Sequence, residues 1–72
     1  MNKPYQVILC ELREDHDLTQ KKVAEILGIL PQTYARYESG ERALPVRHLF
    51  TLADYFKVSS DYILGLAKRD EH

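Results

Sequence analysis

The side chains in this 72-residue sequence that could do chemistry are mostly basic and amide groups gathered in its middle. Residues 18–47 carry five basic side chains against three acidic ones, a net charge of +2, whereas residues 1–17 sum to −2 and residues 48–72 to −1. The net charge of the whole chain is −1, which argues against a surface that is basic throughout. If the protein meets a polyanion, we expect the contact to come from the middle segment.

Other kinds of chemistry find little support in the residue types. Cys10 stands alone, so an internal disulfide is excluded, and His16, His48 and His72 are too far apart for a zinc spacing. We see no nucleophile beside a base, no paired acids and no glycine loop for phosphate, so we expect no enzyme, cofactor or small-molecule ligand. No stretch approaches the ~20 apolar residues of a membrane span, and the N-terminus lacks the apolar core of a signal peptide. These features predict a soluble, cytoplasmic protein.

Apolar residues recur at three- and four-residue steps, which predicts an all-α chain. We expect one domain over residues 1–67 and a short polar tail over 68–72. Turn and capping residues mark the helix limits: Asp15 to Asp17 at the end of the first helix, Thr19 and Gly28 around the second, Pro31 and Gly40 around the third, Pro45 at the start of the fourth, and Ser59 or Ser60 before the fifth. The expected inward faces are Tyr5, Ile8, Leu9, Leu12; Val23, Ile26, Leu27; Tyr34, Tyr37; Val46, Leu49, Leu52, Ala53, Phe56; and Tyr62, Ile63, Leu66.

The stretch from residue 19 to residue 42 has the spacing of two helices that cross steeply through a short turn. Such a crossing needs a small side chain at the contact, which Ala24 supplies, and a residue that tolerates positive φ at the corner, which Gly28 supplies. Tyr34 and Tyr37 would help to close the space between the helices. This spacing predicts a helix-turn-helix.

With these residues the sequence resembles the phage-repressor-like helix-turn-helix proteins of the Cro and Xre type, over roughly residues 5–66. The resemblance also rests on Leu12-Arg13, on Arg36-Tyr37-Glu38-Ser39-Gly40, on Leu52-Ala53-Asp54 and on Val58 to Gly65. It implies a compact, lambda-repressor-like fold of five helices. It further implies a DNA-binding transcriptional regulator, typically a repressor that binds double-stranded operator DNA as a homodimer.

The resemblance also implies roles for individual residues. The third helix would enter the major groove. Gln32, Thr33 and Arg36 occupy its base-reading positions, and an amide and a guanidinium can pair bidentately with adenine and guanine. Gln20 matches a position that binds phosphate, Lys21, Lys22, Arg42 and Arg47 could add to that contact, and Arg13 and Glu38 match a structural ion pair. For the exposed charges, a merely solvated surface is the competing interpretation.

The sequence departs from the family at the start of the third helix. Pro31 occupies a reading position without a side-chain donor or acceptor, so it can offer only an apolar contact, for example to a thymine methyl group. Both the third and the fourth helices begin with Leu-Pro, at Leu30 and Leu44, where the family usually has a Ser or Thr cap. Leucine cannot cap a helix, so some N–H groups are left for water or phosphate. Packing of both leucines is the simpler explanation.

Three further expectations concern the rest of the chain. Tyr62, Ile63, Leu64 and Leu66 crowd more apolar groups into the fifth helix than it can bury internally, which predicts a homodimer interface there. We expect Cys10 to pack against the fifth helix through Tyr62 or Leu66, with a redox-sensing thiol as the competing interpretation, and His48 to lie on the exposed side of the fourth helix. An antitoxin-like or adaptor module that keeps the fold without binding an operator remains the second hypothesis for function.

Overall fold

The protein is a bundle of short helices in the computed structural model, which describes residues 3–66. The helices are α1 (Tyr5–Asp15), α2 (Gln20–Leu27), α3 (Pro31–Ser39), α4 (Val46–Phe56) and α5 (Ser60–Ile63). No strand occurs among these described residues, so the prediction of an all-α, five-helix fold is confirmed. The polar tail expected over residues 68–72 lies outside the described part of the chain.

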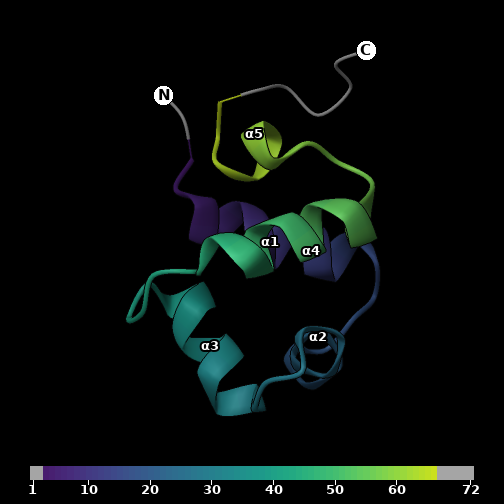
Figure 1. Cartoon of the computed structure of the whole chain (residues 1–72), viewed down its shortest axis with the longest axis vertical. Helices are drawn as coiled ribbons and strands as arrows, with labels where there is room; N and C mark the ends of the chain where they lie inside the picture. Colours follow the sequence, from purple (N-terminus) through teal and green to yellow (C-terminus); the bar gives the residue numbers. More distant parts are fainter. Residues whose placement is uncertain (1–2, 67–72) are drawn as a thin grey trace.

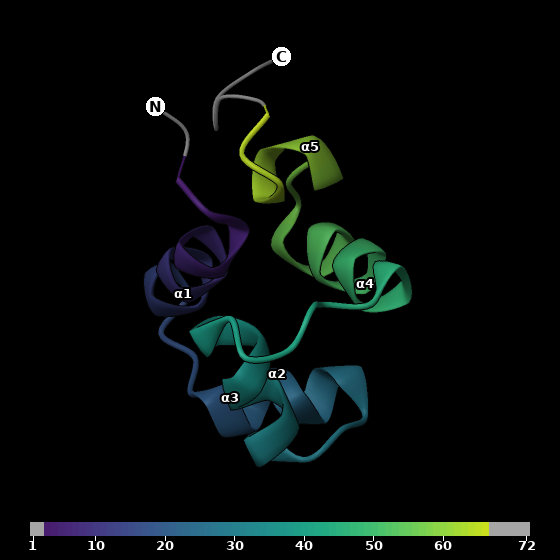
Figure 2. The ribbon, with the colours of Figure 1, turned by 90° about the vertical axis from the view of Figure 1, so that its left-hand side faces the viewer.

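The helices divide the molecule into a lower and an upper half. Figure 1 shows α2 and α3 together at one end of the molecule and α5 toward the other. Figure 2, turned by 90°, shows α1 and α4 on opposite sides between them. Contacts of α1 with α3 and of α2 with α4 join the two halves, and α5 contacts both α1 and α4. The pair α2 and α3 therefore projects from a base built by the other helices.

Local signals set the limits of α2 as the sequence predicts. The hydroxyl oxygen of Thr19 accepts a hydrogen bond from the backbone N–H of Lys22 at 3.0 Å, which caps the helix N-terminus. At the other end Gly28 adopts the left-handed conformation with φ of 72°, which a residue with a side chain would adopt only with strain. Ala24 is fully buried, as its small side chain allows where α2 crosses α3. These three residues fix the turn between the two helices.

The two Leu-Pro dipeptides behave differently. Pro31 is the first residue of α3, as expected, whereas Pro45 is extended, with φ of −62° and ψ of 149°, and precedes α4. Leu44 packs against the core, and its backbone N–H donates a hydrogen bond to the hydroxyl of Tyr5 at 3.1 Å. Leu30, in contrast, is 66% exposed. The expectation that both leucines pack is therefore right for Leu44 and wrong for Leu30.

The hydrophobic core joins all the helices. Its buried members are Ile8, Leu9, Leu12, Val23, Ala24, Tyr34, Tyr37, Leu49, Leu52, Ala53, Phe56 and Ile63. Of the residues expected inside, Ile26 is half-buried and Val46 and Leu66 are exposed. Val46 lies in the first turn of α4, at the border of the buried face, and is 63% exposed.

His48 corrects another expectation. Its side chain is buried rather than exposed, and its ring centroid lies 6.1 Å from that of Tyr37 on α3. The Nε2 atom is buried without a hydrogen-bond partner. Burial, with a smaller effect of the nearby Arg47 charge, lowers the pKa of the imidazole. The neutral ring therefore belongs to the packing between α3 and α4.

Candidate nucleic-acid interface

Helix α3 has one face in the core and one face in solvent. Tyr34 and Tyr37 are buried and anchor the inner face, while Gln32 and Arg36 are exposed. Because residues four apart in a helix share a face, the amide and the guanidinium point to the same side. Thr33 is half-buried between the two faces. The structure thus brings the three expected base-reading residues onto one short helix.

The guanidinium of Arg36 forms a weak, exposed ion pair with Glu41. Its Nε lies 3.9 Å from the Oε2 of Glu41, and the two side chains are 50% and 68% exposed. An exposed ion pair at this distance contributes little, because water screens it. Arg36 can exchange this partner for another acceptor at small cost.

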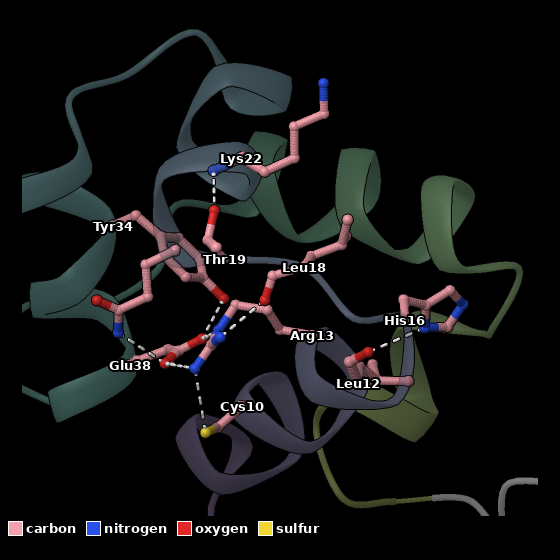
Figure 3. A network of polar contacts seen from close by, with 10 residues as sticks. Cys10, Leu12, Arg13, His16, Leu18, Thr19, Lys22, Tyr34 and Glu38 are labelled. Carbon is pink, nitrogen blue, oxygen red and sulfur yellow. Dashed lines mark hydrogen bonds and ion pairs between the residues drawn. The ribbon is translucent and has the colours of Figure 1, made fainter.

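The other basic residues of the middle segment lie at the surface, before and after α3 in the sequence. Lys21, Lys22, Arg42 and Arg47 are all exposed. The backbone N–H of Arg42 donates to the carbonyl of Arg36 at 3.1 Å, so Arg42 is tied to the C-terminal end of α3. Figure 3 shows the side chain of Lys22 pointing away from the interior contacts, and its Nζ lies 3.8 Å from the carboxylate of Glu25. These cations are therefore available to an external anion.

A buried carboxylate lies at the junction of three elements, as Figure 3 shows. Glu38 accepts hydrogen bonds from Arg13 Nε at 2.7 Å and Nη2 at 3.3 Å, from Gln20 Nε2 at 2.9 Å and from the Tyr34 hydroxyl at 2.8 Å. Arg13 also donates from Nη1 to the carbonyl of Leu18 at 2.9 Å. The pair of Arg13 and Glu38 thus connects α1, the loop before α2, and α3.

The electrostatics of this network favour the ionised carboxylate. Burial acts to raise the pKa of Glu38, but hydrogen bonds from Arg13, Gln20 and Tyr34 outweigh it and leave that pKa below its ordinary value. Burial and the same carboxylate raise the pKa of the Tyr34 hydroxyl, which stays protonated and donates. Because donors from Arg13, Gln20 and Tyr34 converge on one charged acceptor, the network fixes the direction of α3 relative to α1.

Sequence reasoning placed Tyr34 in the core and Gln20 at a phosphate, but it missed their contacts with Glu38. The spacing from residue 34 to residue 38 is one helical turn, which could have indicated the bond from the Tyr34 hydroxyl. The contact with Gln20 depends on how α2 crosses α3, so no local pattern indicates it. Gln20 is half-buried and keeps one of its two amide N–H groups after donating to Glu38.

Cys10 lies on the side of α1 that faces this network. Its sulfur is 3.6 Å from Arg13 Nη2, whereas the sequence placed it toward the fifth helix. Burial raises the pKa of the thiol, and Glu38 and Glu14 add to this effect against the opposing charge of Arg13. A raised pKa makes Cys10 a poor nucleophile, which favours a packing role over a redox-sensing one.

The residues predicted for a dimer interface divide between the core and the surface. Ile63 is fully buried and belongs to the core, so it cannot contact a second copy. Tyr62 is half-buried, while Leu64 and Leu66 are 43% and 68% exposed. Helix α5 has only four residues, so it turns one side chain fully inward and leaves its apolar neighbours near solvent.

Two further properties hold for the described part of the chain. Within residues 3–66, no three His, Cys, Asp or Glu side chains gather in a way that could hold a metal ion. Across the same residues, every helix is too short or too polar to cross a membrane.

Comparison with known proteins places the chain in a family. Residues 11–63 match the protein family described as helix-turn-helix. The chain belongs to this helix-turn-helix family. It is 43% identical over 58 residues to the uncharacterized HTH-type transcriptional regulator YobD of Bacillus subtilis, a match that covers 81% of this chain and 52% of that protein. A transcriptional regulator from Listeria innocua has the same fold, with a TM-score of 0.84 and 29% identity over 100% of this chain and 67% of that chain.

Two other related proteins have names that state different functions, one a repressor and the other an antitoxin. The chain is 33% identical over 64 residues to the cryptic phage CTXphi transcriptional repressor RstR of Vibrio cholerae, covering 89% of this chain and 57% of that protein. It is 37% identical over 54 residues to the antitoxin PezA of Streptococcus pneumoniae, covering 75% of this chain and 34% of that protein. The chain thus spans about half the length, or less, of these curated relatives.

Proposed function

We propose that this protein is a sequence-specific DNA-binding regulator of transcription, and that it acts as a repressor. The observation that carries the proposal is the outer face of α3, where Gln32 and Arg36 are exposed on a helix whose inner face is held by two buried tyrosines. The name of RstR supports the repressor role, since that related protein is a transcriptional repressor. A regulator of this kind works in the cytoplasm, where a lone thiol such as Cys10 stays reduced.

Bases are read by three side chains of α3. Arg36 pairs with guanine through two parallel hydrogen bonds, and Gln32 pairs with adenine in the same way. Thr33, whose side chain is shorter, contacts a base between these two. The weak contact of Arg36 with Glu41, at 3.9 Å, leaves the guanidinium free to exchange this carboxylate for guanine.

Phosphates are bound by basic residues of α2, of the loop after α3 and of α4. Lys21 and Lys22 lie at the start of α2, Arg42 is tied to the end of α3, and Arg47 lies in the first turn of α4. The free amide N–H of Gln20 adds a contact at the N-terminus of α2, where the helix dipole favours an anion. These contacts position the protein on the duplex but do not read its sequence.

The protein binds as a homodimer through the half-buried Tyr62 of α5 and the exposed Leu64 and Leu66 that follow this helix. A two-fold axis there must place the two α3 helices about 34 Å apart to reach successive major grooves. Sedimentation tests this arrangement: a monomer at tens of micromolar both free and on DNA contradicts it. Weak dimerisation that strengthens on DNA agrees with it.

A salt titration of DNA binding tests the function as a whole. A protein that neutralises phosphates releases counterions, so its affinity falls steeply as the salt concentration rises. We expect the binding constant for a duplex selected from random DNA to fall at least about a hundredfold between 50 and 200 mM salt, as for about four or more phosphate contacts. Binding that is absent, or that ignores salt, refutes the function.

A protein-interaction module is the second candidate. Its support is the similarity to PezA, which is named as an antitoxin, together with the net charge of −1 of this chain. Such a module keeps the fold but needs no exposed base-reading groups. The same titration separates the two candidates, because an interaction module shows no salt-dependent affinity for any duplex.

A further inference from the structure

Two residues at the start of α3 expose apolar side chains to solvent. Leu30 is 66% exposed and Pro31 is exposed beside it. The matching dipeptide before α4 provides an internal comparison, because Leu44 packs against the core. Burial therefore explains one leucine of the two and leaves the other unexplained.

Helix capping does not explain Leu30 either. Its backbone carbonyl accepts hydrogen bonds from Thr33 N–H at 3.0 Å and Tyr34 N–H at 3.1 Å, but its side chain makes no capping bond. Elsewhere in the same chain, Thr19 and Ser59 cap α2 and α5 with their hydroxyl oxygens. A serine at residue 30 would do the same and stabilise α3. The chain thus carries an exposed leucine where a polar residue would serve the fold better.

The position of this apolar pair indicates what it touches. Leu30 and Pro31 immediately precede Gln32, on the helix that exposes Arg36. Neither side chain has a donor or an acceptor, and Pro31 lacks a backbone N–H. Among the base edges of the major groove, the apolar feature that such a surface can recognise is the 5-methyl group of thymine.

We propose that Leu30 and Pro31 form an apolar contact with the 5-methyl group of thymine, which makes the protein prefer thymine at one base pair of each half-site. The inference rests on the proposed function and adds to it a specificity that the hydrogen-bonding residues of α3 do not supply. It also predicts that 5-methylcytosine is accepted at this position better than cytosine, because the two differ by the same methyl group.

Replacement of single thymines by deoxyuridine tests the contact. The full chain is bound to its preferred duplex, selected from random DNA, and each thymine of the half-site is replaced in turn. We expect a loss of affinity of about fourfold at one position, the effect of one methyl group no longer removed from water. In Leu30→Ser the loss at that position becomes smaller, because only Pro31 remains to contact the methyl group, while the added helix cap keeps the variant folded. Phe50→Ser, at a residue that is 58% exposed on α4, is the matched control and keeps the wild-type pattern of losses.

Each other outcome overturns the inference in a recognisable way. If no deoxyuridine weakens binding, or if the preferred half-site contains no thymine, the apolar contact does not exist although the protein still binds DNA. If the loss is unchanged in Leu30→Ser, Leu30 does not contact the methyl group and the inference fails. If the chain binds no duplex, the proposed function itself fails, and the inference fails with it.

Discussion

Replacement of Glu38 by glutamine removes a buried charge at the point where α1, α2 and α3 meet. The side chain of Glu38 is 7% exposed and that of its partner Arg13 is 15% exposed, so water cannot replace what is lost. The carboxylate accepts four hydrogen bonds, and in Glu38→Gln one of the two oxygens becomes an NH₂ group. The amide of Gln20 and the hydroxyl of Tyr34 can each turn to accept from that group, but the guanidinium cannot.

The expected loss of stability in Glu38→Gln follows from the hydrogen bonds that this substitution breaks. At least one donor of Arg13 loses its acceptor, and its charge loses its counterion. Breaking a buried pair costs about 3–5 kcal/mol, and the hydrogen bond from Arg13 Nη1 to Leu18 reduces this because it remains. We therefore expect a loss of about 2–3 kcal/mol of unfolding free energy, which lowers the melting temperature of a domain of this size by about 10–20 °C.

Urea unfolding followed by circular dichroism measures this loss. Glu11→Gln is the control, because it breaks an exposed ion pair with Lys3 and should leave the transition midpoint unchanged. A loss in Glu38→Gln no larger than in the control refutes the structural role of the network. The pH dependence supplies a second check. Because the pKa of Glu38 is lowered in the folded protein, its contribution is present above about pH 4.5 and is lost as the pH falls through the folded value, so the wild type and Glu38→Gln should converge there.

Substitutions at two other positions test single features of the fold. Because burial lowers the pKa of His48, the unfolded chain binds the proton more readily, so stability should fall as the pH drops below about 6.5. His48→Phe should remove most of that fall and raise the unfolding free energy by about 1 kcal/mol, since the unpaired Nε2 is no longer buried. Urea titrations at pH 5 and pH 8 that show no such difference between the wild type and the variant contradict this expectation. Lys57 ends α4 in the left-handed conformation with φ of 61°, which glycine adopts without strain. Lys57→Gly should therefore raise the unfolding free energy by about 1 kcal/mol, as measured by thermal melts, whereas Lys57→Ala should not raise it. An equal effect of both substitutions would rule out strain at this residue.

The parts of the structure that sequence could predict are those set by neighbours along the chain. Thr19 and Gly28 limit α2 through their own hydrogen bond and backbone conformation, so their residue types suffice. The separation of α3 into a tyrosine face and a polar face follows from helical periodicity in the same way.

The errors arise where the outcome depends on packing between helices. Leu30 and Leu44 each precede a proline at the start of a helix, yet only Leu44 packs against the core. His48 lies near the border of the buried face of α4, and its burial depends on the ring of Tyr37 from another helix. The contact of Gln20 with Glu38 depends on the crossing of α2 and α3. No pattern within one helix contains this information.

The most direct test of the account compares the affinity of Arg36→Ala for the preferred duplex with its affinity for a scrambled duplex. If Arg36 reads a base, the substitution should cost about 1–3 kcal/mol on the preferred duplex, relax the preference at one base pair of each half-site and leave non-specific affinity almost unchanged. Lys22→Ala is the matched control: it should weaken both duplexes alike and reduce the salt slope by about one unit. An equal loss on both duplexes in Arg36→Ala would contradict the account, because Arg36 would then bind phosphate and α3 would not read sequence through it.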